Sequence, residues 1–582
     1  MGPPPKPAKD PTPRCESKQG NPIDSASGTK YQEELDVELP GRNMTIKRVY
    51  TNAVVERIFR FSHERNINGD LNVPSVTRPS SGVEDFTAQG SSFVPDTGIN
   101  ARLTRLTNAG VTVGWVYVSA NDEIEEYDAR GLLTAITHRS GEKVTLAYAS
   151  LPFSSVTSSF PQSITHRSGR VITFTYDQSN NITSATLPNG ATISYTYGSA
   201  NLLSKVTYPE LTERRYLFNE PANTANTNIP FALTGIVDER QIRQATFKYD
   251  SNGQAVSTEY AGGVNKYSVA YTTPGGSHSI TDPLGSVYTQ GLGTVANENR
   301  VTSSTQPAGA GCAAASSSRQ LDANGNVSTS IDQLGRTTTF TYDLTRNLET
   351  QRVEASGTSI ARTVSSQWHP DWRVASRIAE PLKITTFVYN GQPDPTNANA
   401  VLTCVAPGTP LLPNGKVVGV LCKQVEQATT DASGSLGFSA TSSGSPRVQS
   451  WTYNTAGQAL TYNGPRVDLP TAAEDVTQYA YYTDTQANWR ISDLKSITRP
   501  GGHVTQFTKY DGDGRLLESI DPNGTTTTLT YAPRGWLTKV EVIPSGATVG
   551  LVTMTDYDPS GRVLKVTQPN GSFTARTYDD AG

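Results

Sequence analysis

The sequence predicts an all-β protein built from repeated antiparallel hairpins, and three observations lead to this fold class. The chain is rich in Thr, Val, Ile and Tyr, with 26 Tyr in 582 residues, and these residue types favour strands. Gly (49 residues) and Pro (36 residues) recur between short runs of them, as turn residues do. The third observation is an internal repeat of 21 residues, and such repeats decide the architecture of a chain.

The repeat is clearest near the C-terminus. Tyr510 and Tyr531 are 21 residues apart, and so are Tyr557 and Tyr578. Both segments begin with Tyr-Asp, continue with Gly-Arg and apolar residues, and then reach Pro-Asn-Gly. The two segments are therefore copies of one structural unit.

Looser copies occur earlier in the chain. Tyr127, Tyr176 and Tyr249 are each followed by another Tyr after 21 or 22 residues. A second unit, Ile-Thr-His-Arg-Ser-Gly, occurs at 136–141 and again at 164–169. Further copies begin at Tyr342 and Tyr453, and insertions rich in small and polar residues lie near 296–320 and 391–447.

Each copy is predicted to form two turns and two strands. In Asp-x-x-Gly, Asp caps the turn and Gly takes the position with positive φ. Residues 515–520 then form one strand, Pro522-Asn523-Gly524 forms a tight turn, and residues 525–531 return. A lone hairpin is marginal in water, so each one must pair with its neighbours. A row of copies gives one long meandering sheet, which twist can wind into a spiral.

The segment Asp511-Gly512-Asp513-Gly514 looks like the start of a calcium loop. A calcium hand needs an oxygen ligand at the fifth position, Gly at the sixth and Glu at the twelfth. Here those positions hold Arg515, Leu516 and Pro522. The copies share only Asp-x-x-Gly-Arg, so we predict structural turns and no metal site. The predicted turn residues are Asp511, Gly514, Arg515, Asp558, Gly561 and Arg562.

The sequence carries no recognisable catalytic or cofactor motif. It lacks a nucleophile elbow, a phosphate-binding loop and histidines at metal-ligand spacing. His138 and His166 hold the same place in the two Ile-Thr-His-Arg-Ser-Gly units, which indicates a shared structural task. We therefore predict no catalytic residue, no cofactor and no enzymatic activity.

The four cysteines, Cys15, Cys312, Cys404 and Cys422, form no Cys-x-x-Cys pair, which disfavours a zinc site. Cys404 and Cys422 flank a segment with a Pro-Asn-Gly turn that could fold them together into a disulfide. The alternative is two unpaired thiols buried as small hydrophobic side chains.

Composition excludes some classes of protein. The formal charge is −4, with 49 basic and 53 acidic side chains, whereas nucleic-acid binders usually have a clearly basic face. No stretch approaches the ~20 apolar residues that span a bilayer. Residues 1–20 are rich in Pro and Lys and lack the apolar region of a secretory signal. They are expected to form a flexible tail.

The repeat pattern Tyr-Asp-x-x-Gly-Arg…Pro-Asn-Gly…Tyr-Asp resembles the YD repeats of Rhs-type proteins. Bacterial Rhs proteins, the C subunits of insecticidal toxin complexes and animal teneurins share these repeats. The segment from Gly20-Asn21-Pro22-Ile23 to Tyr50-Thr51-Asn52 is similar to the region that opens the shell in bacterial Rhs proteins. The resemblance implies that the hairpins wind into a spiral, hollow β-shell, the YD-shell.

The resemblance also implies a division of the chain. The tail at 1–20 precedes an N-terminal Rhs-associated β region at 21–126, and the repeats fill 127–582. In several relatives the shell encloses a C-terminal effector, often a toxin, that some release by self-cleavage. The chain stops within a repeat turn at 578–582, so the sequence is expected to be a fragment or a truncated product.

The function that the resemblance implies is a non-enzymatic scaffold, secreted or at the cell surface, that houses or delivers a C-terminal effector. Its expected partners are the enclosed toxin and its secretion apparatus. One alternative is an adhesion protein that binds cell-surface glycans through exposed Tyr and Trp, although repeat Tyr also suit cross-strand packing. Another alternative is an autoproteolytic toxin shell. No nucleic-acid partner and no membrane span are expected.

Overall fold

The structure is a computed structural model of the 582-residue chain. It describes residues 14–41, 44–52, 59–80, 82–89, 92–148, 161–272, 276–296, 298–309, 313–466 and 475–581. Most of the expected tail at 1–20, and Cys312, therefore lie outside the described residues.

The described residues form strands and four short 3₁₀ turns. The N-terminal strands are β1 (Lys18–Gln19), β2 (Ile23–Asp24), β3 (Thr29–Glu38), β4 (Thr45–Thr51), β5 (Phe59–Phe61), β6 (Asn66–Asp70), β7 (Val73–Thr77), β8 (Val83–Gln89) and β9 (Ser92–Pro95). The next strands are β10 (Arg102–Asn108), β11 (Val111–Val118), β12 (Glu123–Asp128), β13 (Leu133–His138), β14 (Lys143–Ala147), β15 (Ser163–His166), β16 (Val171–Tyr176), β17 (Ile182–Thr186), β18 (Thr192–Tyr197), β19 (Leu203–Thr207), β20 (Glu213–Phe218), β21 (Leu233–Val237), β22 (Arg243–Tyr249), β23 (Ala255–Tyr260) and β24 (Tyr267–Ala270).

The strands continue with β25 (Ser277–Thr281), β26 (Val287–Val295), β27 (Glu298–Gln306), β28 (Ala315–Leu321), β29 (Val327–Ile331), β30 (Thr337–Asp343), β31 (Leu348–Glu354), β32 (Arg362–Trp368), β33 (Ala375–Glu380), β34 (Lys383–Tyr389), β35 (Gln392–Asp394) and β36 (Ala400–Leu402). The last are β37 (Leu421–Ala428), β38 (Arg447–Tyr453), β39 (Ala459–Asn463), β40 (Val476–Tyr481), β41 (Leu494–Arg499), β42 (His503–Tyr510), β43 (Leu516–Ile520), β44 (Thr526–Tyr531), β45 (Leu537–Ile543), β46 (Leu551–Tyr557), β47 (Val563–Thr567) and β48 (Phe573–Ala575). The 3₁₀ turns are η1 (Ser199–Asn201), η2 (Pro221–Asn223), η3 (Ala261–Gly263) and η4 (Gly437–Ser439).

One antiparallel sheet dominates the molecule. It has 37 strands, β10–β34 and β37–β48, and each strand pairs with the next one along the chain. Separate small sheets are formed by β1–β5, by β6–β9 and by β35–β36. The predicted all-β fold of meandering hairpins is confirmed. The insertion-rich segments also contribute to the large sheet, because 296–320 contains β27 and most of β28, and 391–447 contains β37.

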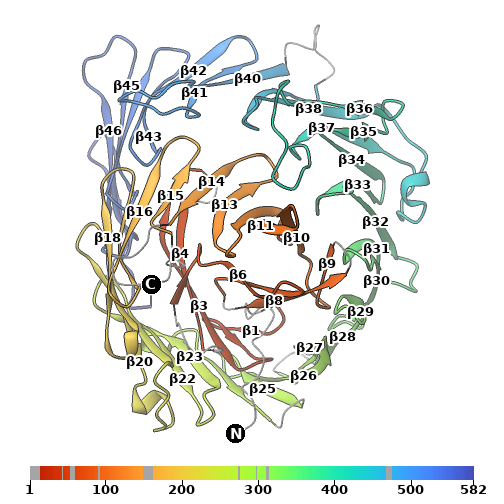
Figure 1. The fold of residues 1–582 in the computed structure, drawn as a ribbon, viewed down its shortest axis with the longest axis vertical. Coiled ribbons are helices and arrows are strands. Elements are labelled where there is room, and N and C mark those ends of the chain that lie inside the picture. The colour runs from red at the N-terminus through yellow and green to blue at the C-terminus, as the bar shows by residue number, and fades with distance from the viewer. Residues whose placement is uncertain are drawn as a thin grey trace.

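The large sheet winds as a spiral (Figure 1). It starts near the centre at β10 and runs around the outside through β20, β26 and β34. Its last strands, from β40 to β46, return beside the early strands β14–β18, completing more than one turn (Figure 1). We call β13–β34 the first coil and β37–β48 the second coil.

The N-terminal strands lie inside the first coil and form its core (Figure 1). Phe59 packs on Tyr216 of β20 with ring centroids 4.7 Å apart, and Phe61 packs edge-on against Tyr195 of β18 at 5.2 Å. Burial of large apolar and aromatic side chains is the main stabilising contribution in such a core. The N-terminal strands therefore act as a plug that holds the first coil in its curve.

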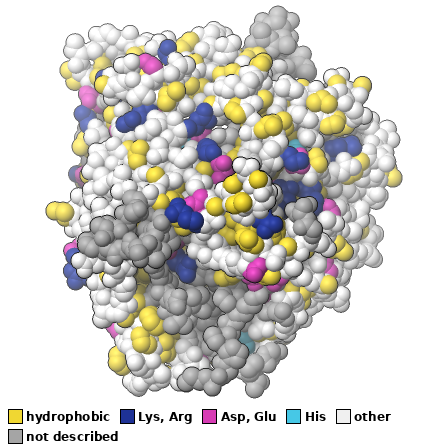
Figure 2. Space-filling view, viewed as in Figure 1, with side chains coloured by type: hydrophobic (Ala, Val, Ile, Leu, Met, Phe, Trp, Pro, Cys, Tyr) yellow, Lys and Arg dark blue, Asp and Glu magenta, His cyan; other side chains and the backbone are white. Residues whose placement is uncertain are grey.

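The second coil lacks such a plug. Within 426–466 and 475–581, no hydrophobic side chain is buried. On the face of the molecule seen in Figure 2, acidic and basic side chains form small mixed groups, with hydrophobic side chains between them. None of the helices formed by the described residues has the length and apolar character needed to cross a membrane.

Candidate functional site

The Asp-x-x-Gly repeat turn is the smallest structural unit of the candidate site. In the copy at Asp558, one carboxylate oxygen accepts backbone N–H groups of Ser560 at 2.9 Å and Arg562 at 3.0 Å. The Arg562 Nε donates to the other oxygen at 2.8 Å, and Gly561 has φ +88°. Burial favours the neutral acid, but the hydrogen bonds from Arg562 and Ser560 prevail and hold the pKa of Asp558 below its usual value.

The turn that resembles a calcium loop has the same construction. Asp511 accepts the backbone N–H of Arg515 at 2.8 Å, and Gly514 has φ +95°. The Arg515 guanidinium lies 3.2 Å from Asp511 and 2.7 Å from Asp513, so a cation occupies the place that a metal would take. Among the described residues, no group of three His, Cys, Asp or Glu side chains is placed to bind a metal ion.

Histidine replaces aspartate in three repeat turns. The Nδ1 atoms of His138 and His166 accept the backbone N–H two residues later, at 3.1 and 3.2 Å. The Nδ1 of His369 accepts the N–H groups of Asp371 and Trp372 at 3.0 and 3.2 Å. The Ile-Thr-His-Arg-Ser-Gly unit is thus the Asp-x-x-Gly turn with an imidazole as the cap. Aligning His138 with Asp511 would have revealed this from the sequence.

His369 gives a testable pH dependence. Burial lowers its pKa from 6.5 to about 4, so the fold requires the neutral ring. The stabilisation is complete above pH 6.5 and is lost as pH falls toward 4, and it amounts to roughly 2 to 3 kcal/mol. His369→Asn keeps an acceptor without the titration, as Asn454 does in its own turn. Chemical unfolding between pH 7 and pH 4 should show the free energy of unfolding of wild type falling by this amount relative to that of the variant.

His503→Asn is the matched control for that experiment, because His503 is exposed at the start of β42. Its unfolding free energy should follow that of wild type at every pH. If the free energies of unfolding of wild type and His369→Asn changed in parallel with pH, the role assigned to the neutral His369 ring would be wrong.

Tyrosine hydroxyls tie each repeat to the one before it. Each of these hydroxyls donates to a backbone carbonyl oxygen 15 or 16 residues earlier, at 2.6–2.9 Å. The pairs are Tyr176 with Pro161, Tyr342 with Val327, Tyr510 with Leu494 and Tyr578 with Val563. Burial raises the pKa of Tyr342 to about 12, so the phenol stays a donor. From the sequence we expected the repeat tyrosines only to pack across strands, and we did not predict these hydrogen bonds.

The second coil docks on the first through contacts between turns, which we call the seam. Its first-coil turns are 138–141, 166–170, 187–190, 208–211 and 238–242, and its second-coil turns are 454–457, 482–493, 511–515, 532–535, 558–561 and 579–581. One of these contacts joins Arg170 to both carboxylate oxygens of Asp493, at 2.8 and 2.9 Å. Both side chains are buried, and a bidentate pair of this kind fixes geometry as well as charge.

Asp513, the second acid of the apparent calcium loop, belongs to the seam. It is fully buried, and its Oδ1 accepts the backbone N–H of Asn189 at 3.0 Å. Burial raises the pKa of Asp513, although Arg515 opposes the shift. Neighbouring Gly512 is so close to Asn189 that a Cβ there would lie 2.8 Å from its Cα.

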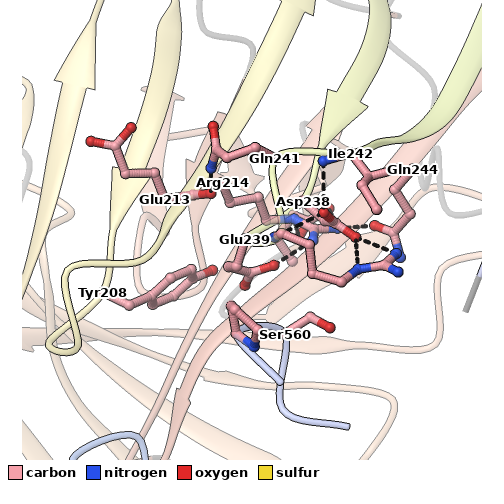
Figure 3. A network of polar contacts seen from close by, with 12 residues as sticks. Tyr208, Glu213, Arg214, Asp238, Glu239, Gln241, Ile242, Gln244 and Ser560 are labelled. Atoms are coloured by element: carbon pink, nitrogen blue, oxygen red, sulfur yellow. Dashed lines mark hydrogen bonds and ion pairs between the residues drawn. The ribbon is translucent and has the colours of Figure 1, made fainter. Parts of the chain in front are cut away.

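Figure 3 shows the seam near Tyr208, with Arg214 and Glu239 of the first coil side by side and Ser560 of the second coil in the same view. Glu239 accepts from Arg214 at 3.3 Å and from Arg534 of the second coil at 3.2 Å. The Arg534 guanidinium stacks on the Tyr208 ring at 3.7 Å, a cation–π contact. Arg214 also pairs with Glu34 of the plug at 2.8 Å. A continuous network of charged side chains therefore joins the plug, the first coil and the second coil.

A cavity of about 600 Å³ lies between the coils at the seam. Its lining includes His138, Glu142, His166, Arg170, Asp493 and Tyr510. His166 contacts Glu142 through Nε2 and Ser168 through Nδ1 at 2.7 Å. The polar groups are thus engaged with one another, which fits a structural junction.

Cys404 and Cys422 are joined by a disulfide, with Cα atoms 5.5 Å apart. The bond closes the segment between β36 and β37 and packs with Trp372 and Val418 in a small second core. Cys15 is a free, exposed thiol.

Replacing both bridging cysteines with serine should lower the free energy of unfolding by about 3 kcal/mol, the value for a loop of this length. Differential scanning calorimetry of the oxidised chain and of the double variant Cys404→Ser, Cys422→Ser measures this. Cys15→Ser is the control and should leave the melting temperature unchanged. Equal melting temperatures for all three proteins would contradict a stabilising role.

The inner face of the second coil follows from strand register. The Tyr216 side chain faces the plug and so marks the inner face of the sheet. Residues that pair directly across neighbouring strands share a face, and following these pairs from Tyr216 leads to Trp451, Phe507, Leu529 and Val540. Between Thr505 and Thr574 this face has no charged side chain in any strand. The opposite face holds all six charged strand residues, Lys509, Glu518, Lys539, Glu541, Asp556 and Lys565.

Nothing in the described part of the chain covers this inner face. Val540 and Leu529 are directly paired and only partly buried, and Leu551 is 56 % exposed. Apolar strand faces normally pack against another layer. Strands β43–β48 thus form a single-layer wall with an uncharged interior.

Family comparisons agree with this architecture. Residues 108–274 match the Teneurin YD-shell, and residues 322–359, 510–548 and 557–582 match the RHS repeat. The chain thus contains a YD-shell segment and RHS repeats, which are the YD repeats of Rhs-type proteins. The predicted resemblance is confirmed, and the YD repeats are the turns and hairpins described above.

Solved structures with likeness to this YD-repeat chain come from toxin complexes. TcdB2-TccC3 without its hypervariable C-terminal region is 14 % identical over 80 % of this chain, with a TM-score of 0.44. TcdB2-TccC3-Cdc42 is 11 % identical over 91 % of this chain, also at 0.44. A Photorhabdus luminescens Tc holotoxin pore is 12 % identical over 91 %, at 0.25. This chain covers 22 %, 31 % and 23 % of those chains. No curated protein matches the sequence.

Proposed function

We propose that this YD-repeat chain forms part of the wall of a hollow shell that encloses a polypeptide effector of the toxin type. The observation that carries the proposal is the uncharged, uncovered inner face of β43–β48. Unfolded or partly folded polypeptides expose apolar side chains, and such a wall offers them apolar surface without charges to desolvate. The YD-shell and RHS-repeat matches support a structural module of this kind.

In this proposal the structural elements of the wall have separate roles. The repeat turns and tyrosine hydroxyls hold the wall, and the seam closes it on itself. In this proposal the wall catalyses no reaction and needs no cofactor. It works outside the cytoplasm, where the Cys404–Cys422 disulfide is stable, and its partners are the enclosed effector and the apparatus that exports it.

Site-specific photo-crosslinking tests the proposal. A photoreactive phenylalanine analogue replaces Val540 on the inner face or Val552 on the outer face, which pairs with Glu541. Each full chain is refolded with reduced, carboxymethylated α-lactalbumin as an unfolded probe. Crosslinks from 540 and none from 552 are expected. Equal crosslinking from both positions, or none from 540, would reject an interior that holds polypeptide.

The glycan-binding alternative has one favourable observation. Tyr482 and Trp489 stack with centroids 4.3 Å apart beside Asp484, in the turn between β40 and β41. Aromatic faces next to carboxylates suit sugar rings. Glycan-array binding that Trp489→Ala abolishes would favour this function, and an array without signal would remove it.

A further inference from the structure

Four arginines gather where the start of the large sheet meets its outer strands, and we call them the arginine cluster. They are Arg102 at the start of β10, Arg139 in the turn after β13, Arg346 in the turn after β30 and Arg373 in the turn after β32. Figure 1 shows β9, which precedes β10, beside β31. The Asn347 side chain donates to that of Asn100 at 2.9 Å and joins these two regions.

Backbone carbonyl oxygens hold the four guanidinium groups in place. Arg346 donates to the carbonyl oxygens of His369 and Trp372, both at 2.8 Å. In the same way, Arg373 donates to residues 346 and 347, Arg102 to residue 371, and Arg139 to residue 419. Among the described residues these contacts use one or two of the five N–H donors of each guanidinium. The remaining donors are available to another acceptor.

The arginine cluster has more positive than negative charge. Within the described ranges its arginines form no ion pair with a carboxylate, whereas Arg48 of the plug and Arg170 of the seam each do. Lys416 lies beside the cluster and pairs with Asp371 at 2.9 Å. The acids that act on the cluster are Asp122, Asp343 and Asp371. Five cations and three acids leave an excess of two positive charges.

His369 places a buried hydrogen-bond donor without an acceptor at the cluster. Its Nδ1 accepts two backbone N–H groups, so the neutral ring carries its proton on Nε2. The residue is 2 % exposed, and its Nε2 has no hydrogen-bond partner among the described residues. The charges of Arg346 and Arg139 act on this ring. Because buried polar groups are normally hydrogen-bonded, the Nε2–H indicates a bound acceptor.

Asp122 adds a buried acceptor without a donor at the same place. Its Oδ2 accepts the backbone N–H of Arg373 at 2.8 Å, whereas its Oδ1 has no partner in the part of the chain that the structure describes. Arg139 acts on both Asp122 and His369. The Tyr389 ring packs edge-on against His369 at 5.4 Å and is itself affected by Asp122. The unpartnered donor and acceptor therefore belong to one site.

We propose that the arginine cluster binds one inorganic phosphate ion. Hydrogen phosphate has two negative charges, which match the excess of two positive charges. Its oxygens accept the remaining guanidinium N–H groups and the Nε2–H of His369, and such charge-assisted hydrogen bonds are strong. Arginine is the side chain best suited to this recognition. The bound ion connects β10 with the turns after β30 and β32.

The free oxygen of Asp122 makes the site selective. Hydrogen phosphate carries one hydroxyl group, which donates to Oδ1 of Asp122. Sulfate has the same shape and charge but no hydroxyl to donate. The phosphate group of a monoester has also lost its hydroxyl proton at pH 7.5, because its second pKa is about 6. Free phosphate should therefore bind more tightly than either of these anions.

Equilibrium dialysis of the full chain against radiolabelled inorganic phosphate tests the site, at pH 7.5 and constant ionic strength. Wild type should bind one phosphate per chain. Sulfate and glycerol 2-phosphate should each compete about tenfold less well than unlabelled phosphate, the effect of one hydrogen bond to a charged group. Phosphate should also raise the melting temperature of wild type, because it binds the folded chain.

Two variants and a control assign the binding to this site. Arg102→Met should weaken phosphate binding about tenfold or more. In Asp122→Asn, the amide oxygen keeps the contact with Arg373 and the amide nitrogen becomes a donor, so sulfate should become the better competitor. Arg362→Met should bind phosphate like wild type, because Arg362 is exposed at the other end of β32. Thermal unfolding checks that each variant folds.

Saturable binding of phosphate that Arg102→Met weakens and Asp122→Asn redirects to sulfate supports the proposal. Three results overturn it. They are wild type that binds no phosphate, sulfate that competes with wild type as well as phosphate does, and binding that Arg362→Met weakens as much as Arg102→Met. None of these readouts depends on an enclosed effector, so this inference and the proposed function fail separately.

Discussion

Replacing Arg48 with methionine is expected to lower the free energy of unfolding by about 3 to 5 kcal/mol. Arg48 is fully buried in the plug, where its Nε and Nη2 donate to Asp36 at 2.7 and 2.8 Å. Asp36 also accepts the hydroxyls of Tyr195 at 2.9 Å and Tyr208 at 3.3 Å. Methionine fills much of the space but leaves the Asp36 carboxylate buried without its cation.

Two further variants isolate the charge effect. Lys47→Met removes the neighbouring ion pair with Glu33, in which each side chain is 43 % exposed. This change should lower the free energy of unfolding by less than about 1 kcal/mol. Adding Asp36→Leu to Arg48→Met should recover much of the loss, because an apolar pair leaves no unpaired charge. Urea unfolding of the four proteins measures these differences. A loss below about 1 kcal/mol for Arg48→Met would show that the plug does not depend on this pair.

Gly457→Ala is expected to detach the second coil locally and to lower the free energy of unfolding by about 2 to 4 kcal/mol or more. Gly457 has φ +73°, and a Cβ there would lie 1.8 Å from the backbone oxygen of Ser140 across the seam. The positive φ itself costs about 1 kcal/mol. The clash adds about 1 to 3 kcal/mol or more, because the obstacle is backbone rather than a flexible side chain.

Gly546→Ala is the matched control for the seam. Gly546 has φ +77°, and a Cβ there meets nothing within 4 Å. It should therefore show only the backbone cost of about 1 kcal/mol. Limited proteolysis should cut the second coil of Gly457→Ala faster than that of Gly546→Ala. Identical unfolding and cleavage for the two variants would show that close approach at the seam contributes nothing.

Local features of the fold could be predicted from the sequence, because their partners lie within a few residues. Asp558 and Arg562 meet within one turn, so the repeat pattern alone indicates their contact. The hairpins follow for the same reason, since consecutive strands pair with each other throughout the large sheet.

Contacts between coils could not be predicted in this way. Asp513 meets Asn189, which is 324 residues away, and the pairing of the two turns depends on the curvature and pitch of the whole spiral. The charge-free face of the last strands is visible in their alternation, but only the contact of Tyr216 with the plug shows that this face is the inner one.

The most direct test of the shell account is a cryo-electron microscopy map of the purified 582-residue chain. We expect a spiral sheet with the second coil seated on the first along the seam, and an empty space bounded by Leu529, Val540 and Leu551. Density for Arg170 against Asp493 would mark the closed seam. A second coil separated from the first, or one whose inner face is packed against another layer of the same chain, would contradict a hollow wall.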